Sequence, residues 1–215
     1  MREYHKIQTI FKRDMENKHK TLLEGQWTLP EFEYLQNNEW VFTEKVDGTN
    51  IRVMFDGDNV TFGGKTDNAQ IPSSLVTRLN ELFLTMERKS LMKSTFHASK
   101  EICLYGEGYG AKIQKGGGNY SPTQDFVLFD IRVGEWWLLR EDVEQIAATL
   151  SLTVVPIISR GTLSQMIEVV KNGIKSQWGD FLAEGIVARP AVELRTRSNH
   201  RIITKLKTRD FVGVK

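Results

Sequence analysis

The chain has 215 residues, of which 40% are hydrophobic and 26% are charged, a composition that excludes disordered and fibrous proteins. No apolar run reaches the roughly 18 residues of a membrane helix, and the charged N-terminus has no secretory signal, so we expect a cytoplasmic protein that binds no membrane. Cys103 is the single cysteine and the four histidines lack metal-ligand spacing, which excludes a structural zinc site.

Charge is unevenly distributed along the chain. The formal net charge is +2, but residues 189–215 contain 8 Lys and Arg against 2 Asp and Glu, which leaves 21 against 25 for the rest. This asymmetry predicts an anionic partner near the C-terminal segment.

The pattern of the chain changes near residue 40. Residues 1–40 are charged, show little periodicity and are interpreted as an extension packed on the core, with one domain over residues 41–215. From Trp40 onward the runs WVFTEKV, IRVMF and VTFGG are separated by the turn sequences DGTN and DGDN. These runs predict three successive antiparallel strands, a β-meander.

Helices and further strands follow. One helix is predicted over residues 73–89 with Ser73 or Ser74 as its cap, and its apolar face would comprise Leu75, Val76, Leu79, Leu82, Phe83 and Met86. Two more helices are predicted near 143–150 and 163–170, and strands at 101–107, 125–133, 153–158, 184–190 and 201–207. Because strands outnumber helices without regular alternation, we expect an α+β fold of mainly antiparallel sheets flanked by helices.

The most informative segment is Lys45-Val46-Asp47-Gly48-Thr49-Asn50, which alone would suit a surface lysine beside a hairpin. It is followed in order by four more segments: Tyr105-Gly106-Glu107-Gly108, Phe126-Val127-Leu128-Phe129-Asp130, Glu184-Gly185-Ile186-Val187 and Lys205-Leu206-Lys207. The series resembles motifs I, III, IIIa, IV and V of the covalent nucleotidyltransferase superfamily of ligases and mRNA capping enzymes. Because the first segment ends in Asn50, it is similar to the corresponding motif of ATP-dependent RNA ligases, especially of the RNA ligase 2-like phage enzymes.

The resemblance implies a nucleotidyltransferase core, an ATP-grasp-like ligase fold, and an AMP-forming reaction. ATP would transfer AMP to Lys45, the AMP would pass to a 5′-phosphate, and a 3′-OH would displace it. The implied substrate is RNA in an RNA repair role; whether it is a nicked duplex, a duplex end, a single strand or an RNA/DNA hybrid is left open.

Physical chemistry gives separate reasons for the lysines. A lysine with an unperturbed pKa of about 10.4 costs about 4.6 kcal/mol to deprotonate at pH 7, and Lys45 must attack as a neutral amine. Lys205 and Lys207 are two apart in a predicted strand and project from one face, so their charges near Lys45 would favour its neutral form. The same pair can stabilise charge on an α-phosphate, which makes Lys45, Lys205 and Lys207 the candidate catalytic residues.

The acidic residues suit a metal. Asp47, Glu107 and Glu184 offer the oxygen ligands that Mg²⁺ prefers, with Mn²⁺ as an alternative, and the resemblance implies that they hold the waters of a hydrated ion. For each acid taken singly, a salt-bridged or solvated surface position is the competing interpretation.

Further residues are assigned to the nucleotide by the resemblance, which implies that Glu107 contacts the ribose and Phe129 stacks on the adenine. Core packing is the alternative for Phe129, since Phe126, Leu128 and Asp130 would share one strand face and Val127, Phe129 and Ile131 the other. Lys65 follows two glycines, but Asn59 occupies the place of the first P-loop glycine, so a phosphate loop is rejected. Glu44, Asn50 and Lys65 complete the expected nucleotide contacts, which also include Lys45, Glu184, Lys205 and Lys207.

Two features leave alternatives open. The loop 112–120 has two lysines and three glycines and could equally contact RNA or be a flexible surface loop. Only eight residues follow Lys207, which leaves no room for an OB-fold domain, so we expect a monomeric isolated core in which residues 1–40 or a protein partner supply the end-binding module. A minimal DNA ligase, a guanylyltransferase and a non-catalytic nucleotide-responsive RNA-binding module are the competing functions.

Overall fold

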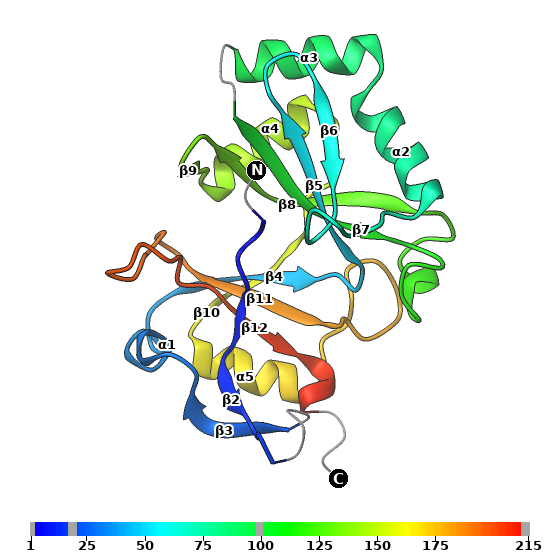
Figure 1. Cartoon of the computed structure of the whole chain (residues 1–215). Coiled ribbons are helices and arrows are strands. Elements are labelled where there is room, and N and C mark those ends of the chain that lie inside the picture. The colour runs from blue at the N-terminus through cyan, green and yellow to red at the C-terminus, as the bar shows by residue number, and fades with distance from the viewer. Residues whose placement is uncertain (1–2, 17–20, 98–100, 212–215) are drawn as a thin grey trace. The chain divides into compact units, whose positions relative to one another are not determined.

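The computed structural model describes residues 3–16, 21–97 and 101–211 and divides into two compact units. Unit 1 comprises Met1–His5 and Asp47–Val155, and unit 2 comprises Lys6–Val46 and Pro156–Lys215. Both units combine helices with mostly antiparallel sheets, which confirms the predicted α+β class (Figure 1). Within the described ranges no helix combines the length and the apolar character needed to cross a membrane.

Unit 2 is built on a five-stranded sheet. Its order is β1 (Gln8–Thr9), β12 (Thr204–Lys207), β11 (Gly185–Pro190), β4 (Trp40–Lys45) and β10 (Ile157–Gly161). Every pair is antiparallel except β1 with β12, which is parallel. β2 (Phe11–Arg13) and β3 (Leu22–Trp27) form a separate antiparallel pair, and α1 (Pro30–Tyr34), α5 (Leu163–Lys171) and the 3₁₀ turn η2 (Thr208–Asp210) complete the unit.

The core of unit 2 explains α5. Leu163, Met166, Ile167 and Val170 recur at helical spacing and pack with Phe42, Ile186 and Leu206 of the sheet. The helix begins with a capping box. The Thr162 hydroxyl accepts from the backbone N–H of Gln165, and the Gln165 side-chain oxygen accepts from the backbone N–H of Thr162.

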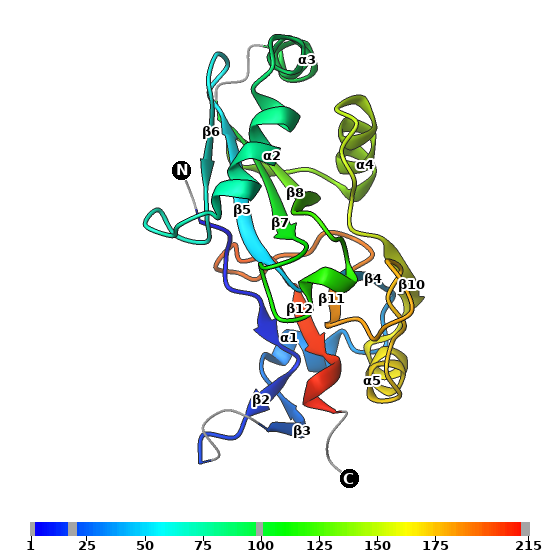
Figure 2. The ribbon, with the colours of Figure 1, turned by 90° about the vertical axis from the view of Figure 1, so that its right-hand side faces the viewer.

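Unit 1 contains a second antiparallel sheet of five strands. The order is β6 (Val60–Gly63), β5 (Thr49–Phe55), β7 (Ile102–Tyr109), β8 (Asp125–Val133) and β9 (Trp136–Trp137). The helices α2 (Ser73–Phe83), α3 (Met86–Phe96) and α4 (Arg140–Thr149) lie on one side of this sheet (Figure 2), and a short 3₁₀ turn, η1 (Gly117–Asn119), interrupts the β7–β8 loop. The apolar residues of β5, β7 and β8 that face the helices, such as Ile51, Leu104 and Leu128, form a core with Leu75 and Leu79.

Two predictions about local structure are wrong. The meander does not form, because β4 is paired on both edges with β11 and β10 while β5 pairs with β6 and β7. The predicted helix over 73–89 is two helices, because the Thr85 hydroxyl caps a new helix by accepting from the Arg88 amide. Met86 is consequently 86% exposed, and α2 begins after Pro72 without a side-chain cap.

The predicted alternation along β8 is also wrong beyond Leu128. The register moves from Gly106 opposite Leu128 to Tyr105 opposite Asp130, which leaves Phe129 as the extra residue of a β-bulge. Ile131 therefore joins Phe126 and Leu128 in the core cluster. Bulges reorient the side chain at the extra position, so Phe129 is only half-buried.

Candidate active site

A cluster of three lysines and one glutamate lies at one end of the unit 2 sheet. The Lys45 Nζ donates to Glu184 Oε2 at 2.5 Å, and the Lys207 Nζ lies 2.6 Å from Glu184 Oε1. One carboxylate thus binds two of the three lysines, and its side chain is only 12% exposed. Burial raises the pKa of Glu184, but the charges of Lys45 and Lys207 and their hydrogen bonds lower it more, so the pKa lies below the ordinary 4.5.

The strand register explains why these residues meet. Gly185 at the start of β11 lies opposite Lys45 of β4 on one side and Lys207 of β12 on the other. A Cβ at Gly185 would lie 2.0 Å from the backbone oxygen of Leu206, so only glycine permits this approach of β11 to β12. The residue before this glycine, Glu184, is therefore held between the two lysines.

Lys205 is the unpaired member of the cluster. It is two residues from Lys207 on the same face of β12, and it forms no ion pair with any carboxylate in residues 3–16, 21–97 or 101–211. Burial, together with the charges of Lys207 and Lys45, lowers the pKa of Lys205 from 10.5 to about 8. The folded protein thus disfavours the charged form of Lys205, which a bound anion would stabilise.

We expect Lys205→Met to increase the free energy of unfolding at pH 7 by about 1 kcal/mol, because it removes a charge that is disfavoured by burial and repelled by Lys207 and Lys45. Lys207→Met, the matched control on the same strand face, should lower it, because Glu184 loses a partner. The lowered pKa of Lys205 also predicts a pH dependence. Between about pH 8 and 10.5 the folded protein has lost the Lys205 proton while the unfolded chain still holds it, so the free energy of unfolding of the wild type should rise with pH over this range. Urea unfolding curves of the three proteins measure both effects, and equal destabilisation by the two substitutions would show that Lys205 carries no uncompensated charge.

Glu44 faces the interior of unit 2. It is 1% exposed, and its carboxylate accepts from the Ser176 hydroxyl at 2.6 Å and from the Gln177 amide at 2.8 Å. Burial raises the pKa of Glu44, an effect that these two hydrogen bonds oppose. Its carboxylate anchors the loop before Glu184, a function that the sequence did not reveal, and its expected contact with the nucleotide stays a prediction.

Unit 1 carries the other predicted nucleotide contacts on the sheet face away from its helices. Asn50 of β5 lies directly opposite Glu107 of β7, so the two side chains share this face. The Asn50 Oδ1 is buried and has no hydrogen-bond partner among the described residues. A buried acceptor without a donor is costly, which makes this oxygen a candidate contact for a ligand.

Phe129 lies on the same face as part of an aromatic group. The ring of Tyr4 contacts Phe129 edge-on at a centroid distance of 5.1 Å, and it lies 5.1 Å from the ring of Tyr105. The Tyr4 hydroxyl donates to Asp130 Oδ2 at 2.7 Å. Tyr4 therefore supports the residue expected to stack on adenine, and no motif in the sequence pointed to it.

Lys65 is exposed on a loop that a buried arginine holds. Arg52 is fully buried, and it donates to the Gly64 backbone oxygen at 2.8 Å and to Asp67 at 2.7 Å. Because these bonds enclose Lys65 on both sides in sequence, Arg52 fixes the loop from which Lys65 projects.

The turn at Asp47 and Gly48, where the main segment of unit 1 begins, is held by the loop 112–120. The amide of Asp47 donates to the Tyr120 hydroxyl at 3.4 Å, and the Gln114 side chain donates to the Gly48 backbone oxygen at 3.0 Å. The structure thus gives this loop a supporting role, which was neither of the two interpretations drawn from the sequence, and its contact with RNA stays a prediction. A Cβ at Gly48 would lie 2.2 Å from the Gly108 oxygen and 2.8 Å from Glu107 Cγ, so glycine lets the turn approach Glu107.

We expect Gly48→Ala to lower the free energy of unfolding by about 2 kcal/mol, because the added methyl group meets backbone that cannot rotate away. Gly118→Ala is the matched control, since nothing lies within 4 Å of the added Cβ. Thermal unfolding of both variants tests this, and a Gly48→Ala protein as stable as the control would contradict the close approach.

The three acids expected to serve a metal divide between the units, with Asp47 and Glu107 in unit 1 and Glu184 in unit 2. In neither unit do the described residues bring three or more His, Cys, Asp or Glu side chains together as a metal site. The residues offer carboxylate oxygens and, beside Glu107, the unpartnered amide oxygen of Asn50. These ligands fit a hydrated ion that is bound partly by phosphate oxygens rather than an ion held by the protein alone.

Comparisons with known proteins address the fold and the family. The sequence profile of a family described as RNA ligase matches residues 38–207, whereas no curated protein sequence matches. A variant of the Naegleria gruberi RNA ligase with ATP and Mn is 16% identical, with a TM-score of 0.68, and the match covers 96% of this chain and 56% of that one. The same ligase with PPi is 18% identical, with a TM-score of 0.65 and coverage of 95% and 57%.

The structural similarity, at this identity, shows the fold alone, and the chain spans little more than half the length of those ligases. The profile match covers most of the chain, from before Trp40 to the last lysine of the cluster. The chain therefore belongs to the RNA ligase family.

Proposed function

We propose that this chain is an ATP-dependent RNA ligase that works through a covalent Lys45–AMP intermediate. The observation that carries the proposal is the cluster in which Glu184 binds Lys45 and Lys207 through its two oxygens while Lys205 forms no ion pair with a described carboxylate. A nucleophile and two phosphate-binding cations are thereby preorganised at one end of the unit 2 sheet.

The first step uses all three lysines. The neutral amine of Lys45 attacks the α-phosphorus of ATP; the N–P bond forms, the bond from the α-phosphorus to the bridging oxygen breaks, pyrophosphate leaves with the electron pair, and the nitrogen releases one proton to solvent. Lys205 and Lys207 stabilise the negative charge that grows on the phosphate oxygens. Glu184 holds Lys45 and Lys207 at a fixed spacing before the nucleotide arrives.

The remaining residues bind the nucleotide. On the face of the unit 1 sheet away from its helices, Glu107 would accept from a ribose hydroxyl, Asn50 would accept a hydrogen bond from the ligand, and Phe129 would stack on the base. Lys65, on the loop that Arg52 holds, would place a point charge near the ribose or a phosphate.

The residues also fit a divalent ion that is bound together with the nucleotide. Asp47, Glu107 and Glu184 would hold the waters of Mg²⁺ or Mn²⁺, and the ion would supply positive charge against the phosphates.

The two later steps define ligation. A 5′-phosphate oxygen of RNA attacks the Lys45-bound phosphorus, the P–N bond breaks, and the amine leaves after its nitrogen takes up a proton. The 3′-OH then attacks the activated 5′-phosphorus, loses its proton to solvent, and AMP departs with the electron pair. We further propose that the chain acts as a cytoplasmic monomer with RNA as its substrate, and that residues 1–40 or a partner protein position the two ends.

The test is joining of a nicked duplex with a 5′-phosphate and a 3′-OH, supplied with ATP, GTP or no nucleotide, and with RNA or DNA on each side of the nick. The proposal predicts a joined strand with ATP and with RNA at the nick. Joining only of DNA, or nucleotide transfer only from GTP, would instead indicate the DNA ligase or guanylyltransferase function. Transfer of AMP to the protein without joining would contradict ligation by this chain alone.

A further inference from the structure

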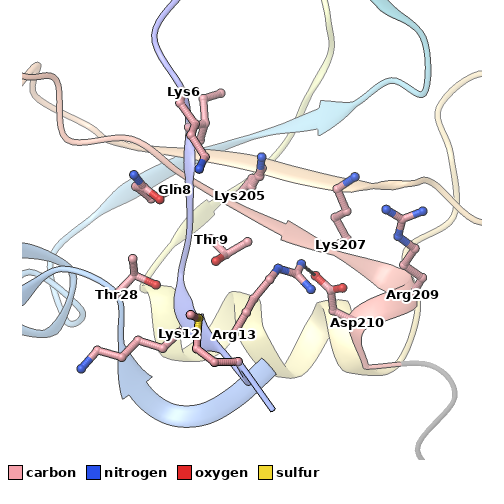
Figure 3. A pocket seen from close by; sticks show the side chains of 12 residues that line it. Lys6, Gln8, Thr9, Lys12, Arg13, Thr28, Lys205, Lys207, Arg209 and Asp210 are labelled. Carbon is pink, nitrogen blue, oxygen red and sulfur yellow. Dashed lines mark hydrogen bonds and ion pairs between the residues drawn. The ribbon is translucent and has the colours of Figure 1, made fainter. Parts of the chain in front are cut away.

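A cationic cavity of about 830 Å³ lies in unit 2 between β12 and the N-terminal strands (Figure 3). At one side it is lined by Lys205 and Lys207 of the cluster, and Lys45 is not among its lining residues. Its other walls come from residues 6–15, from Thr28 and from η2. The N-terminal walls lie outside residues 38–207, the part of the chain that matches the family profile.

The cavity has far more positive than negative charge. Six lining residues are cationic, namely Lys6, Lys12, Arg13, Lys205, Lys207 and Arg209, and Asp210 is the only acid among the lining residues. Asp210 is already bound by Arg13 at 2.6 Å. Lys6, Lys205 and Arg209 have no ion pair with any described carboxylate, and the Thr28 hydroxyl has no described hydrogen-bond partner. Uncompensated charges that line one cavity indicate an anionic ligand.

The cations do not all point the same way. Figure 3 shows Lys6, Lys205, Lys207 and Arg209 along β12, whereas the Lys12 side chain extends away from them. Parallel pairing of Gln8 with Thr204 and of Thr9 with Lys205 fixes the segment that carries Lys6 beside the lysine strand. Lys6 and Arg209 are therefore candidates to extend the phosphate-binding surface beyond Lys205 and Lys207.

The chemistry of the proposed function explains why such an extension is needed. In the first step pyrophosphate leaves the α-phosphorus opposite Lys45, because the entering and leaving groups of a phosphoryl transfer are in line. In the second step Lys45 is itself the leaving group, so the 5′-phosphate of RNA must enter from the side that pyrophosphate vacated. Both steps thus place a terminal phosphate on the same side of the α-phosphorus.

We propose that this cavity is a single terminal-phosphate site, which holds the β- and γ-phosphates of ATP in the first step and the 5′-phosphate of RNA in the second. Lys6 and Arg209 bind these phosphates, and Lys205 and Lys207 connect them to the α-phosphate. The inference rests on the proposed function for the order of the steps. The cavity and its unpaired cations are observations independent of it.

The test uses Lys6→Ala and Arg209→Ala, with Lys175→Ala as the control, because Lys175 is an exposed lysine of unit 2 that does not line the cavity. All three residues are exposed, so we expect the substitutions to leave the folded structure intact. Protein carrying Lys45–AMP is treated with pyrophosphate, or with RNA bearing a 5′-phosphate or a 5′-OH, and discharge of AMP is followed by intact mass. We expect the pyrophosphate and the 5′-phosphate RNA concentrations for half-maximal discharge to rise about tenfold in both variants and to stay unchanged in Lys175→Ala.

The outcomes separate the two proposals. If pyrophosphate discharge weakens but RNA discharge does not, or the reverse, the shared site is wrong and the cavity serves one source of phosphate. If the control weakens equally, the effect is general charge rather than this site. Calorimetric titration of the unmodified protein with pyrophosphate tests the cavity when no Lys45–AMP forms, because loss of binding in Lys6→Ala and Arg209→Ala would then support the site although the proposed function had failed.

Discussion

Lys45→Ala should form no covalent nucleotide adduct under any condition, while it still binds ATP non-covalently with an affinity within about tenfold of wild type. The substitution removes the nucleophile but leaves Glu184, Lys207 and Lys205 in place. Transfer of radiolabelled AMP and calorimetric ATP binding measure the two properties separately.

Lys175→Ala is the control for this prediction. Lys175 also forms an ion pair in unit 2, with Asp180 at 2.9 Å, but its side chain is 70% exposed. This variant should transfer AMP at the wild-type rate, because exposed ion pairs contribute little. An adduct on Lys45→Ala would assign the nucleophile to another residue.

Glu184→Gln should lower the free energy of unfolding by about 3 kcal/mol, because it leaves two mostly buried lysines beside Lys205 without their shared counter-charge. AMP transfer should fall about 100-fold, because Lys45 and Lys207 are no longer held at one spacing. Glu168→Gln is the matched control, since Glu168 also binds a lysine, Lys171, but is 67% exposed; its effect should stay within about 0.5 kcal/mol.

The stability effect of Glu184 has a predicted pH dependence. Its folded-state pKa lies below 4.5, so its contribution is fully present above pH 4.5 and is lost as pH falls through the folded-state pKa. The difference between wild type and Glu184→Gln in urea unfolding should therefore shrink below pH 4.5. A difference that stays constant with pH would show that packing rather than charge is responsible.

Much of the fold was predictable where a single element carries its own signal. The apolar spacing of α5 and the strand patterns of β7 and β8 predicted elements that the structure confirms. Strand partners were less predictable, because a turn sequence such as DGTN indicates a change of direction but does not determine which strands pair across it. β4 and β5, which the DGTN turn connects, belong to different sheets.

For the site, the resemblance to the ligase motifs pointed to Lys45, Glu184, Lys205 and Lys207, which the register of three strands brings into one cluster. Supporting residues could not be found this way. Arg52, Tyr4 and Ser176 act through contacts between residues distant in sequence, and none has a local pattern that distinguishes it. The two-residue strand β1 is likewise too short for a periodic signal, although it brings Lys6 to the cationic cavity.

The most direct test of the proposed Lys45–AMP intermediate is peptide mass mapping of the wild-type protein after incubation with ATP and Mg²⁺. We predict one added AMP per chain, on the peptide that contains Lys45, and its loss when pyrophosphate is added. No adduct, or an adduct on Lys205 or Lys207 in place of Lys45, would contradict the assignment of the nucleophile and of the cluster built around it.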